Sequence, residues 1–393
     1  MLLFFFVAIC GINIYNWWKL RVAFLQGSPW GSFFLLIAFL ALALMPAWLR
    51  VLFRSRGHVP DWLEQLAWIW LAWAFWLTAV FLALELWNLV TLSIWNFRAG
   101  LSDVALADLR SFALSPKATV AVAVAAVCLA TVWGIVEAQC ITLKHLTVTT
   151  DKLPPGTDDF RILLLADLHV GPALNQRQLR RVISLAADAK PDLILSAGDL
   201  LDGKASRERN FAQQLAEMTA PHGKIACVGN HDVYTGIDAS RELHDLAGFT
   251  LLEDTGVWAT DWLWIAGPVD PHYYNYYNFY HHPQAVSKQP PPEVLLPNLS
   301  DNAPANPFAI LLKHRPEPEN QAAFDLQLSG HTHGGQIFPF NILVHWHHSW
   351  KSGRLHQLPA GTLFYISRGT GVWGPPFRLF APPEMTVITL KRP

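Results

Sequence analysis

The stretch "RILLLADLH", residues 161–169, joins a short run of large apolar residues to an acid and a histidine. A run of four to eight apolar residues between polar ones is typical of a strand that is buried on both faces of a sheet. Asp167 stands at the end of this run, and His169 follows two residues later. We therefore expect a buried strand that ends in side chains able to bind a metal or to transfer protons.

The sequence after this strand alternates between apolar runs and segments with helical spacing. Asn175 provides an N-cap for the first helical segment. Strands and helices that alternate at this length indicate an α/β domain with largely parallel strands. The next expected strands are "DLILSA" (192–197), "KIACV" (224–228), "FAILL" (308–312) and "FDLQL" (324–328), and the expected helices cover 175–190, 209–218 and 239–247.

Two segments near the end and one long insert complete this region. "LFYIS" (363–367) and "MTVITL" (385–390) are expected to be strands of a second sheet. Residues 270–307 are rich in Tyr, His and Pro and have no clear period, so we expect a loop or lid.

Polar side chains follow each expected strand, and in open α/β sheets function gathers at the carboxyl ends of strands. They are carboxylates, imidazoles and one amide, without a thiolate, which suits Mn²⁺, Fe²⁺ or Zn²⁺. The set is too large for one tetrahedral ion and is about right for two ions that share a carboxylate. The candidates are Asp167, His169, Asp199, Asn230, His231, His314, His331 and His333.

Each motif alone is a weaker indication of a metal site than the whole set. "GDLLDG" (198–203) and "GNHD" (229–232) are also compatible with ordinary turns. The doublet "GHTHGG" (330–335) is more specific, because its glycines permit the close approach and unusual backbone angles that a metal loop needs. In an extended backbone its two imidazoles point in opposite directions, so each would serve a different ion.

In this order the motifs resemble the calcineurin-like metallophosphoesterase family, with D-x-H, G-D-x-x-D, G-N-H-[DE], a lone H and G-H-x-H all present. The resemblance covers residues 158–393, and the segments around "GHTHGGQ" (330–336) and "SRGTGVWGPPFRLFAPPEMTVITL" (367–390) resemble the membrane-attached bacterial branch. It implies a sandwich of two sheets flanked by helices, within the α/β class. It also implies one ion on Asp167, His169 and His333, a second on Asn230, His314 and His331, and Asp199 between them.

The same resemblance assigns two roles beside the ions. His231 would stabilise the transferring phosphoryl group or protonate the leaving oxygen without binding a metal. Asp232 would lie behind the ligands and orient His231.

The first 140 residues differ sharply in composition from the rest. The chain is 52% hydrophobic and 15% charged, and 12 of its 18 tryptophans precede residue 140. About 20 apolar residues cross a bilayer. We expect an all-helical membrane region over 1–140, a linker over 141–157, and four spans near Leu2–Trp18, Gly31–Leu49, Leu63–Leu92 and Ala118–Val136.

Charge adds little to this picture. Glu85 lies inside the third expected span, and we expect it near a membrane interface, because no second charge within the spans is available to pair with it. Lysines and arginines fall almost equally on both sides, so the side that carries the C-terminal domain is undecided. The net charge of −1 gives no reason to expect a nucleic-acid partner.

The sequence therefore predicts a multi-pass protein of the cell membrane that hydrolyses a phosphoester or pyrophosphate bond. Tethering to the bilayer favours a lipid-linked substrate. Two alternatives stay open: a non-catalytic scaffold that keeps the fold, and a sensor or transporter in which the helices are the functional part. The intact motif set argues against the first, and the absence of paired charges in the spans argues against the second.

Overall fold

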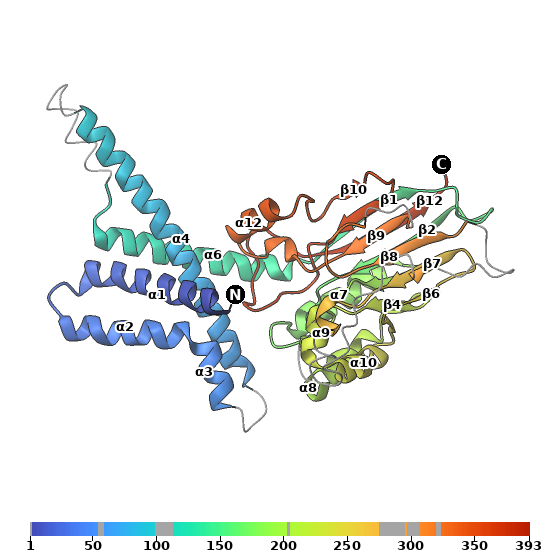
Figure 1. The fold of residues 1–393 in the computed structure, drawn as a ribbon, viewed down its shortest axis with the longest axis horizontal. Coiled ribbons are helices and arrows are strands. Elements are labelled where there is room, and N and C mark those ends of the chain that lie inside the picture. Colours follow the sequence, from blue (N-terminus) through green and yellow to red (C-terminus); the bar gives the residue numbers. More distant parts are fainter. Residues whose placement is uncertain are drawn as a thin grey trace. The chain divides into compact units, whose positions relative to one another are not determined.

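The computed structural model describes residues 2–53, 59–98, 113–202, 205–274, 295–296, 306–319 and 324–393 (Figure 1). The chain divides into two compact units, Met1–Trp133 and Gly134–Pro393, and their boundary falls within helix α6 (Pro116–Gln139). Most of the expected insert over 270–307 lies outside the described residues.

The first unit is helical. Its other helices are α1 (Leu2–Phe24), α2 (Pro29–Ala43), α3 (Met45–Leu52) and α4 (Asp61–Arg98). Within the described residues, Asp61–Ile94 of α4 and the whole of α6 are long and apolar enough to cross a membrane. The pair α2 and α3 adds a third span if it counts as one broken helix, since it bends by 69°.

The part of the chain that the structure describes thus shows two or three such helices, where we expected about four spans. The first expected span lies in α1, a helix of 23 residues. The second is interrupted at Leu44, where Pro46 lies in the first turn of α3. Proline cannot donate a backbone hydrogen bond and disfavours a helical residue before it, which explains the bend.

Polar contacts connect α1 and α4 inside this unit. The Asn16 amide donates to the carbonyl of Ala74 at 2.8 Å, and Trp70 donates to the side chain of Asn13 at 3.1 Å. Lys19 forms an ion pair with Glu85. Our expectation that Glu85 lacks a charged partner was wrong, because the sequence does not show that α1 brings Lys19 beside α4.

The first sheet of the second unit has the order β1-β12-β2-β3-β4-β5. It contains β1 (Thr142–Thr149), β2 (Asp159–Leu165), β3 (Leu193–Ser196), β4 (Lys224–Cys227), β5 (Thr250–Leu252) and β12 (Glu384–Lys391). Strands β2 to β5 are parallel, whereas β12 is parallel to β1 and antiparallel to β2.

Two expectations are corrected by this sheet. The segment 141–157 is not merely a linker, because its residues 142–149 form β1. The tail strand "MTVITL" belongs to β12 of this first sheet and not to the second one. The apolar pattern of a strand identifies buried faces but does not identify the neighbouring strand, which explains the second error.

The second sheet has the order β10-β11-β9-β8-β7-β6 and completes a two-sheet sandwich flanked by helices, as expected. It contains β6 (Thr255–Trp258), β7 (Leu263–Gly267), β8 (Phe308–Leu312), β9 (Leu326–Ser329), β10 (Leu355–Gln357) and β11 (Leu363–Ile366). Its four central strands are parallel, and the strand at each edge is antiparallel.

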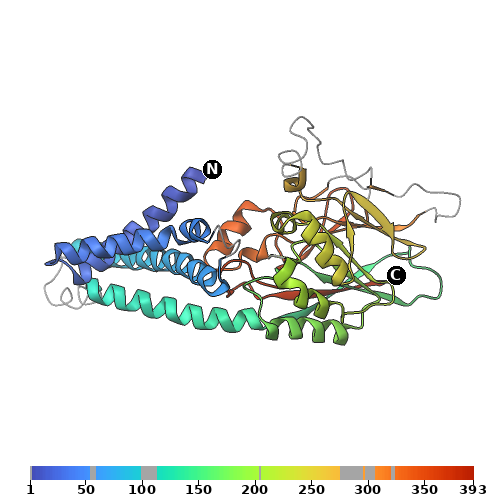
Figure 2. The same ribbon diagram turned by 90° about the horizontal axis from the view of Figure 1, so that it is seen from below.

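Strand β2 shows how the layers are held together. Leu163 and Leu165 pack in a buried cluster with residues of α7 (Gln176–Ala189), α8 (Ala205–Leu215) and α10 (Ile237–Leu246). Ile162 and Leu164 belong to a second cluster, which lies between the two sheets. Alternate side chains of one strand thus fill two cores, and the helices cover the outer face of the first sheet (Figures 1 and 2).

Candidate metal centre

The expected site residues lie on loops that follow the parallel strands of both sheets. Asp167 and His169 follow β2, Asp199 follows β3, and Asn230 follows β4 at the start of α9 (Asn230–Thr235). From the second sheet, the loop after β8 carries His314, and the loop after β9 carries His331 and His333, with His333 beginning the short 3₁₀ helix η3 (His333–Gly335).

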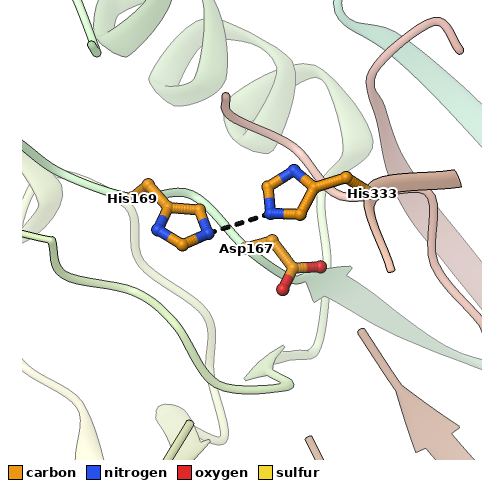
Figure 3. A group of neighbouring side chains, drawn as sticks. All are labelled: Asp167, His169 and His333. Atoms are coloured by element: carbon orange, nitrogen blue, oxygen red, sulfur yellow. Dashed lines mark hydrogen bonds between the residues drawn. The ribbon is translucent and has the colours of Figure 1, made fainter. Parts of the chain in front are cut away.

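The first group of candidate ligands consists of Asp167, His169 and His333 (Figure 3). One potential ligand atom from each lies within 4.8 Å of the others, and all three side chains are buried. The Nε2 atoms of His169 and His333 are 2.9 Å apart. Two nitrogen ligands at about 2.1 Å from one ion and at right angles to each other are separated by about 3 Å, so this geometry fits a shared metal.

The second group consists of Asp199, His314 and His331. Nε2 of His314 lies 3.1 Å from Nδ1 of His331 and 3.2 Å from Oδ2 of Asp199. The side-chain oxygen of Asn230 lies 3.1 Å from the same nitrogen. Three potential ligand atoms thus lie within 3.2 Å of Nε2 of His314, and the four atoms together offer a mixed nitrogen and oxygen set.

Asp199 connects the two groups. Its Oδ2 atom is 3.2 Å from Nε2 of His314 and 3.7 Å from Nε2 of His169. Its other oxygen, Oδ1, accepts a hydrogen bond from the backbone N–H of His231 at 2.8 Å, which holds the carboxylate in place. One carboxylate oxygen therefore reaches both groups, as a bridging ligand must.

The backbone of the site is unusual. Positive φ angles occur at five of the candidate ligands: Asp167 (51°), His169 (48°), Asp199 (51°), His331 (71°) and His333 (50°). Residues other than glycine rarely adopt this left-handed region, and such strain persists where the surrounding structure enforces it. Here the strained residues are those whose side chains converge.

Charge in the site is unevenly distributed. Burial raises the pKa of Asp167 to about 6. Burial acts against ionisation of Asp199 too, but the adjacent His314 lowers the pKa of this carboxyl well below its usual range. Although burial acts to lower it, the charge of Asp199 raises the pKa of His314 to about 10.

The two histidines of the "GHTHGG" motif behave differently. Burial, followed by the charge of His314, lowers the pKa of His331 to about 3. Burial also holds the pKa of His333 well below its usual range. Both imidazoles are therefore neutral near pH 7, which is the state that binds a metal ion.

His231 lies beside the candidate ligands. We expected Asp232 to orient it, but its hydrogen-bond partner is Asp202. Its Nδ1 atom lies 2.7 Å from Oδ1 of Asp202, and Oδ2 of Asp202 lies 3.6 Å from Nδ1 of His169. Asp232 instead accepts hydrogen bonds from the backbone N–H groups of Asp199, at 3.0 Å, and of Gly229, at 2.8 Å. Asp202 thus orients His231, whereas Asp232 supports the two loops. Asp202 is the second acid of the G-D-x-x-D motif, and this position could have indicated that it orients His231.

Arg378 is a second residue whose role the sequence did not reveal. Its guanidinium is fully buried and donates to the carbonyls of His333 at 3.2 Å, Arg368 at 2.8 Å and Ala381 at 2.9 Å. Both Nε and Nη2 donate to the carbonyl of Gly371. This arginine therefore ties the loop that carries His333 to the segment after β11. No spacing rule connects the two segments in the sequence.

Comparisons with known proteins agree with this geometry. The sequence model for calcineurin-like phosphoesterases matches residues 160–335. A metallophosphoesterase of Aquifex aeolicus is 32% identical over 259 residues, which cover 65% of this chain and 94% of the relative. The metallophosphoesterase YkuE of Bacillus subtilis is 30% identical over 277 residues, covering 65% of this chain and 87% of the relative.

One relative also contains transmembrane segments. A transmembrane protein with a metallophosphoesterase domain from Danio rerio is 32% identical over 282 residues. The alignment covers 66% of this chain and 60% of that protein. Together with the apolar helices of the first unit, this similarity indicates an association with membranes.

Proposed function

Since the chain belongs to the calcineurin-like phosphoesterase family, we propose that it is a multi-pass protein of the cell membrane that hydrolyses phosphoric esters or pyrophosphates with two divalent ions. The observation that carries this proposal is the position of Asp199, whose Oδ2 atom faces both groups of candidate ligands. A mononuclear site would not need this carboxylate to reach both.

The ligand sets follow from the two groups. Asp167, His169 and His333 would hold one ion. A second set, Asn230, His314 and His331, would hold the other, and Asp199 would bridge them. When bound, the ions would supply Lewis-acid stabilisation of the attacking and leaving oxygens of a phosphoryl displacement. Nitrogen and oxygen donors suit Mn²⁺, Fe²⁺ or Zn²⁺.

His231 would act as a proton donor or as an electrostatic stabiliser. Asp202 accepts the hydrogen bond from its Nδ1, so Nε2 is the nitrogen left to face substrate. Burial acts to lower the pKa of His231, but the hydrogen bond with Asp202 and the charge of Asp199 raise it. A raised pKa keeps the imidazole protonated at higher pH, which suits a group that donates to a phosphoryl or leaving oxygen.

Two features support a lipid-linked substrate with a bulky group beside its phosphate. The apolar helices would keep the domain at the bilayer. The rings of Tyr234 and Trp373 lie 5.3 Å and 5.4 Å from the ring of His231, and both are exposed. These rings form an aromatic rim next to the proposed proton donor, where an apolar or planar leaving group would be accommodated.

The test uses the full-length protein in detergent or nanodiscs, stripped of metal and reloaded with Mn²⁺. Bound metal is counted by mass spectrometry, and turnover is measured on an aryl phosphodiester, an aryl phosphomonoester and a nucleotide–lipid pyrophosphate. We expect two ions per chain and turnover of at least one substrate. His231→Ala should retain both ions and lose about 10²- to 10⁴-fold in rate, whereas His314→Ala should lose an ion.

The matched control is His145→Ala, which removes an exposed histidine outside the site. It should leave both metal content and turnover unchanged. Two bound ions without turnover of any of the three substrates would instead identify a non-catalytic metal-binding module. A single bound ion in the wild-type protein would contradict the bridging role of Asp199.

A further inference from the structure

The surface of the second unit carries an apolar patch on and around α12 (Phe340–His347). No residue of this eight-residue helix is buried. Trp346 is 87% exposed and Phe380 63% exposed. The other large apolar side chains exposed here are Phe338, Phe340, Ile342 and Leu343. We call these six residues the α12 patch.

The patch is continuous although it comes from two segments. The rings of Phe338 and Phe380 have centroids 5.6 Å apart. The backbone N–H of Phe338 donates to the carbonyl of Leu379 at 3.1 Å, and Asn341 donates to the carbonyl of Phe380 at 3.4 Å. On α12, Ile342 and Trp346 are four residues apart and therefore share a face. Exposed apolar clusters of this kind usually mark an interaction surface.

The end of α6 indicates which partner the patch meets. Residues 134–139 of this helix belong to the second unit. The N–H of Arg378 donates to the carbonyl of Gly134 at 3.0 Å. The carboxylate of Glu137 accepts from the N–H groups of Phe380 at 3.1 Å and Ala381 at 2.7 Å. The segment that carries Phe380 is thus bonded directly to the last turns of a membrane-spanning candidate.

The level of the bilayer along α6 follows from its charges. Between Lys117 and Glu137 the helix has no charged residue. These 19 residues span about 28 Å at 1.5 Å per residue, which is about the thickness of the hydrocarbon core of a bilayer. Glu137 therefore marks the place where α6 leaves the hydrocarbon, and the backbone N–H of Phe380 is hydrogen-bonded to its carboxylate.

We propose that the α12 patch inserts into the interfacial layer of the same bilayer that α6 crosses. Tryptophan and phenylalanine favour this layer, where an apolar body meets hydrated headgroups. The exposed cations Lys351 and Arg354 follow α12 in the chain and suit anionic headgroups. The partner is a lipid surface, and protein partners are outcomes of the test.

Insertion would also place the candidate metal loop at the membrane surface. Only four residues separate His333 from Phe338. Between them, Gln336 donates to the carbonyls of Trp373 at 2.8 Å and Pro375 at 3.2 Å. The loop is thus held between the patch and the aromatic rim. On the basis of the proposed function, a lipid-linked phosphate would reach the ions while its acyl chains stay in the bilayer.

The depth of the patch can be measured on the full-length chain in nanodiscs that contain anionic lipid. In a background in which Cys10, Cys128, Cys140 and Cys227 are replaced, a nitroxide is attached at Trp346→Cys, at Phe380→Cys or, as a control, at exposed Glu217→Cys. Oxygen concentrates in lipid, and a nickel chelate remains in water. We expect oxygen collisions to dominate at 346 and 380, and chelate collisions at 217.

Two results would overturn the proposal. Labels at 346 and 380 that resemble the label at 217 would show that the patch faces water. Labels shielded from both reagents would show that protein covers the patch, either a second copy or other parts of this chain. The Phe380→Cys label lies outside α12, so it remains informative if the Trp346→Cys variant fails to fold.

A kinetic arm separates this inference from the proposed function. Phe340→Ser/Trp346→Ser should hydrolyse a water-soluble aryl phosphoester within about twofold of the wild-type rate. Its rate on a lipid-linked pyrophosphate in vesicles should fall at least tenfold. Equal losses of rate on both substrates would contradict the proposal that the α12 patch helps a lipid-linked phosphate to reach the ions. If the wild-type protein turns over neither substrate, the proposed function fails, and the depth measurement still decides whether the patch inserts.

Discussion

The Nδ1 atom of His231 lies 2.7 Å from the Oδ1 atom of Asp202. This contact connects the loop after β4 to the loop after β3. Burial acts to raise the pKa of Asp202, but the adjacent His169 and the hydrogen bond with His231 lower it. The acid is therefore ionised in the site. An ionised carboxylate on one nitrogen of an imidazole fixes the ring and favours its protonated form.

Asp202→Asn should therefore slow catalysis by about 10- to 100-fold, the usual cost of losing a residue that orients a functional group. The loss should appear in kcat more than in KM. Activity that depends on protonated His231 falls as pH rises through the pKa of this group. Since Asp202 raises the pKa of His231, the variant should lose activity at a lower pH than the wild type. The pH–rate profile checks this shift.

Asp188→Asn is the matched control, because Asp188 is exposed on α7. It should leave the rate and the pH profile unchanged. A uniform loss of rate for Asp202→Asn at every pH, without a shift of the profile, would show that Asp202 serves only the structure of the loop.

The proximity of the candidate ligands could be predicted from the sequence because the carboxyl ends of parallel strands meet at one edge of a sheet. Asp167, Asp199 and Asn230 each follow such a strand, so their proximity needed no knowledge of side-chain positions. The strain at these loops could not be predicted. Asp167 and Asp199 adopt positive φ, and no local propensity assigns that conformation to an aspartate after a strand.

Long-range partners were the main source of error. The apolar pattern of β12 identified a strand but not its place between β1 and β2. Lys19 and Glu85 are 66 residues apart and became partners only through helix packing. Arg378 looked like one basic residue among several near the C-terminus, and its burial depends on carbonyls from two segments that are distant in the sequence. In each case the decisive contact lies outside the range of sequence periodicity.

Metal binding should release protons. In the metal-free protein His314 has a pKa raised to about 10, so it is protonated at pH 7 and must lose this proton to bind an ion. Asp167, with a pKa of about 6, contributes only a small fraction of a proton at pH 7. Calorimetric titration with Mn²⁺ in buffers of different ionisation enthalpy should show release of at least about one proton. The apparent affinity should rise with pH up to about 10.

The same pKa predicts the stability of the metal-free protein. A folded pKa above the usual 6.5 means that charged His314, paired with Asp199, stabilises the fold fully below about pH 6.5. This contribution is lost as pH rises through about 10. Thermal unfolding of the metal-free protein between pH 6 and 10 should follow this trend, and His314→Asn should flatten it. If the calorimetric titration with Mn²⁺ showed no proton release at pH 7, His314 would already be neutral in the metal-free protein.

Arg378→Met should destabilise the second unit. The variant removes the donors to the carbonyls of Arg368, Gly371 and Ala381, and each buried polar group left without a partner costs about 1–3 kcal/mol. We expect a loss of at least about 3 kcal/mol, together with weaker binding of the ion on His333. Thermal unfolding and metal titration measure the two effects. Arg354→Met, at an exposed arginine, should change stability by less than about 0.5 kcal/mol.

The contact between Gly229 and Asp199 tests the bridging ligand without changing any ligand. A Cβ atom at position 229 would lie 2.2 Å from Oδ1 and 2.4 Å from the backbone nitrogen of Asp199. Gly229 has a φ of −97°, which any residue adopts, so only this close approach excludes a side chain. Gly229→Ala should therefore displace Asp199, lower the metal content below two ions and reduce turnover at least about 100-fold. Gly11→Ala, where a Cβ atom would meet nothing within 4 Å, should retain both ions. Full metal content in Gly229→Ala would mean that Asp199 is not required for both ions.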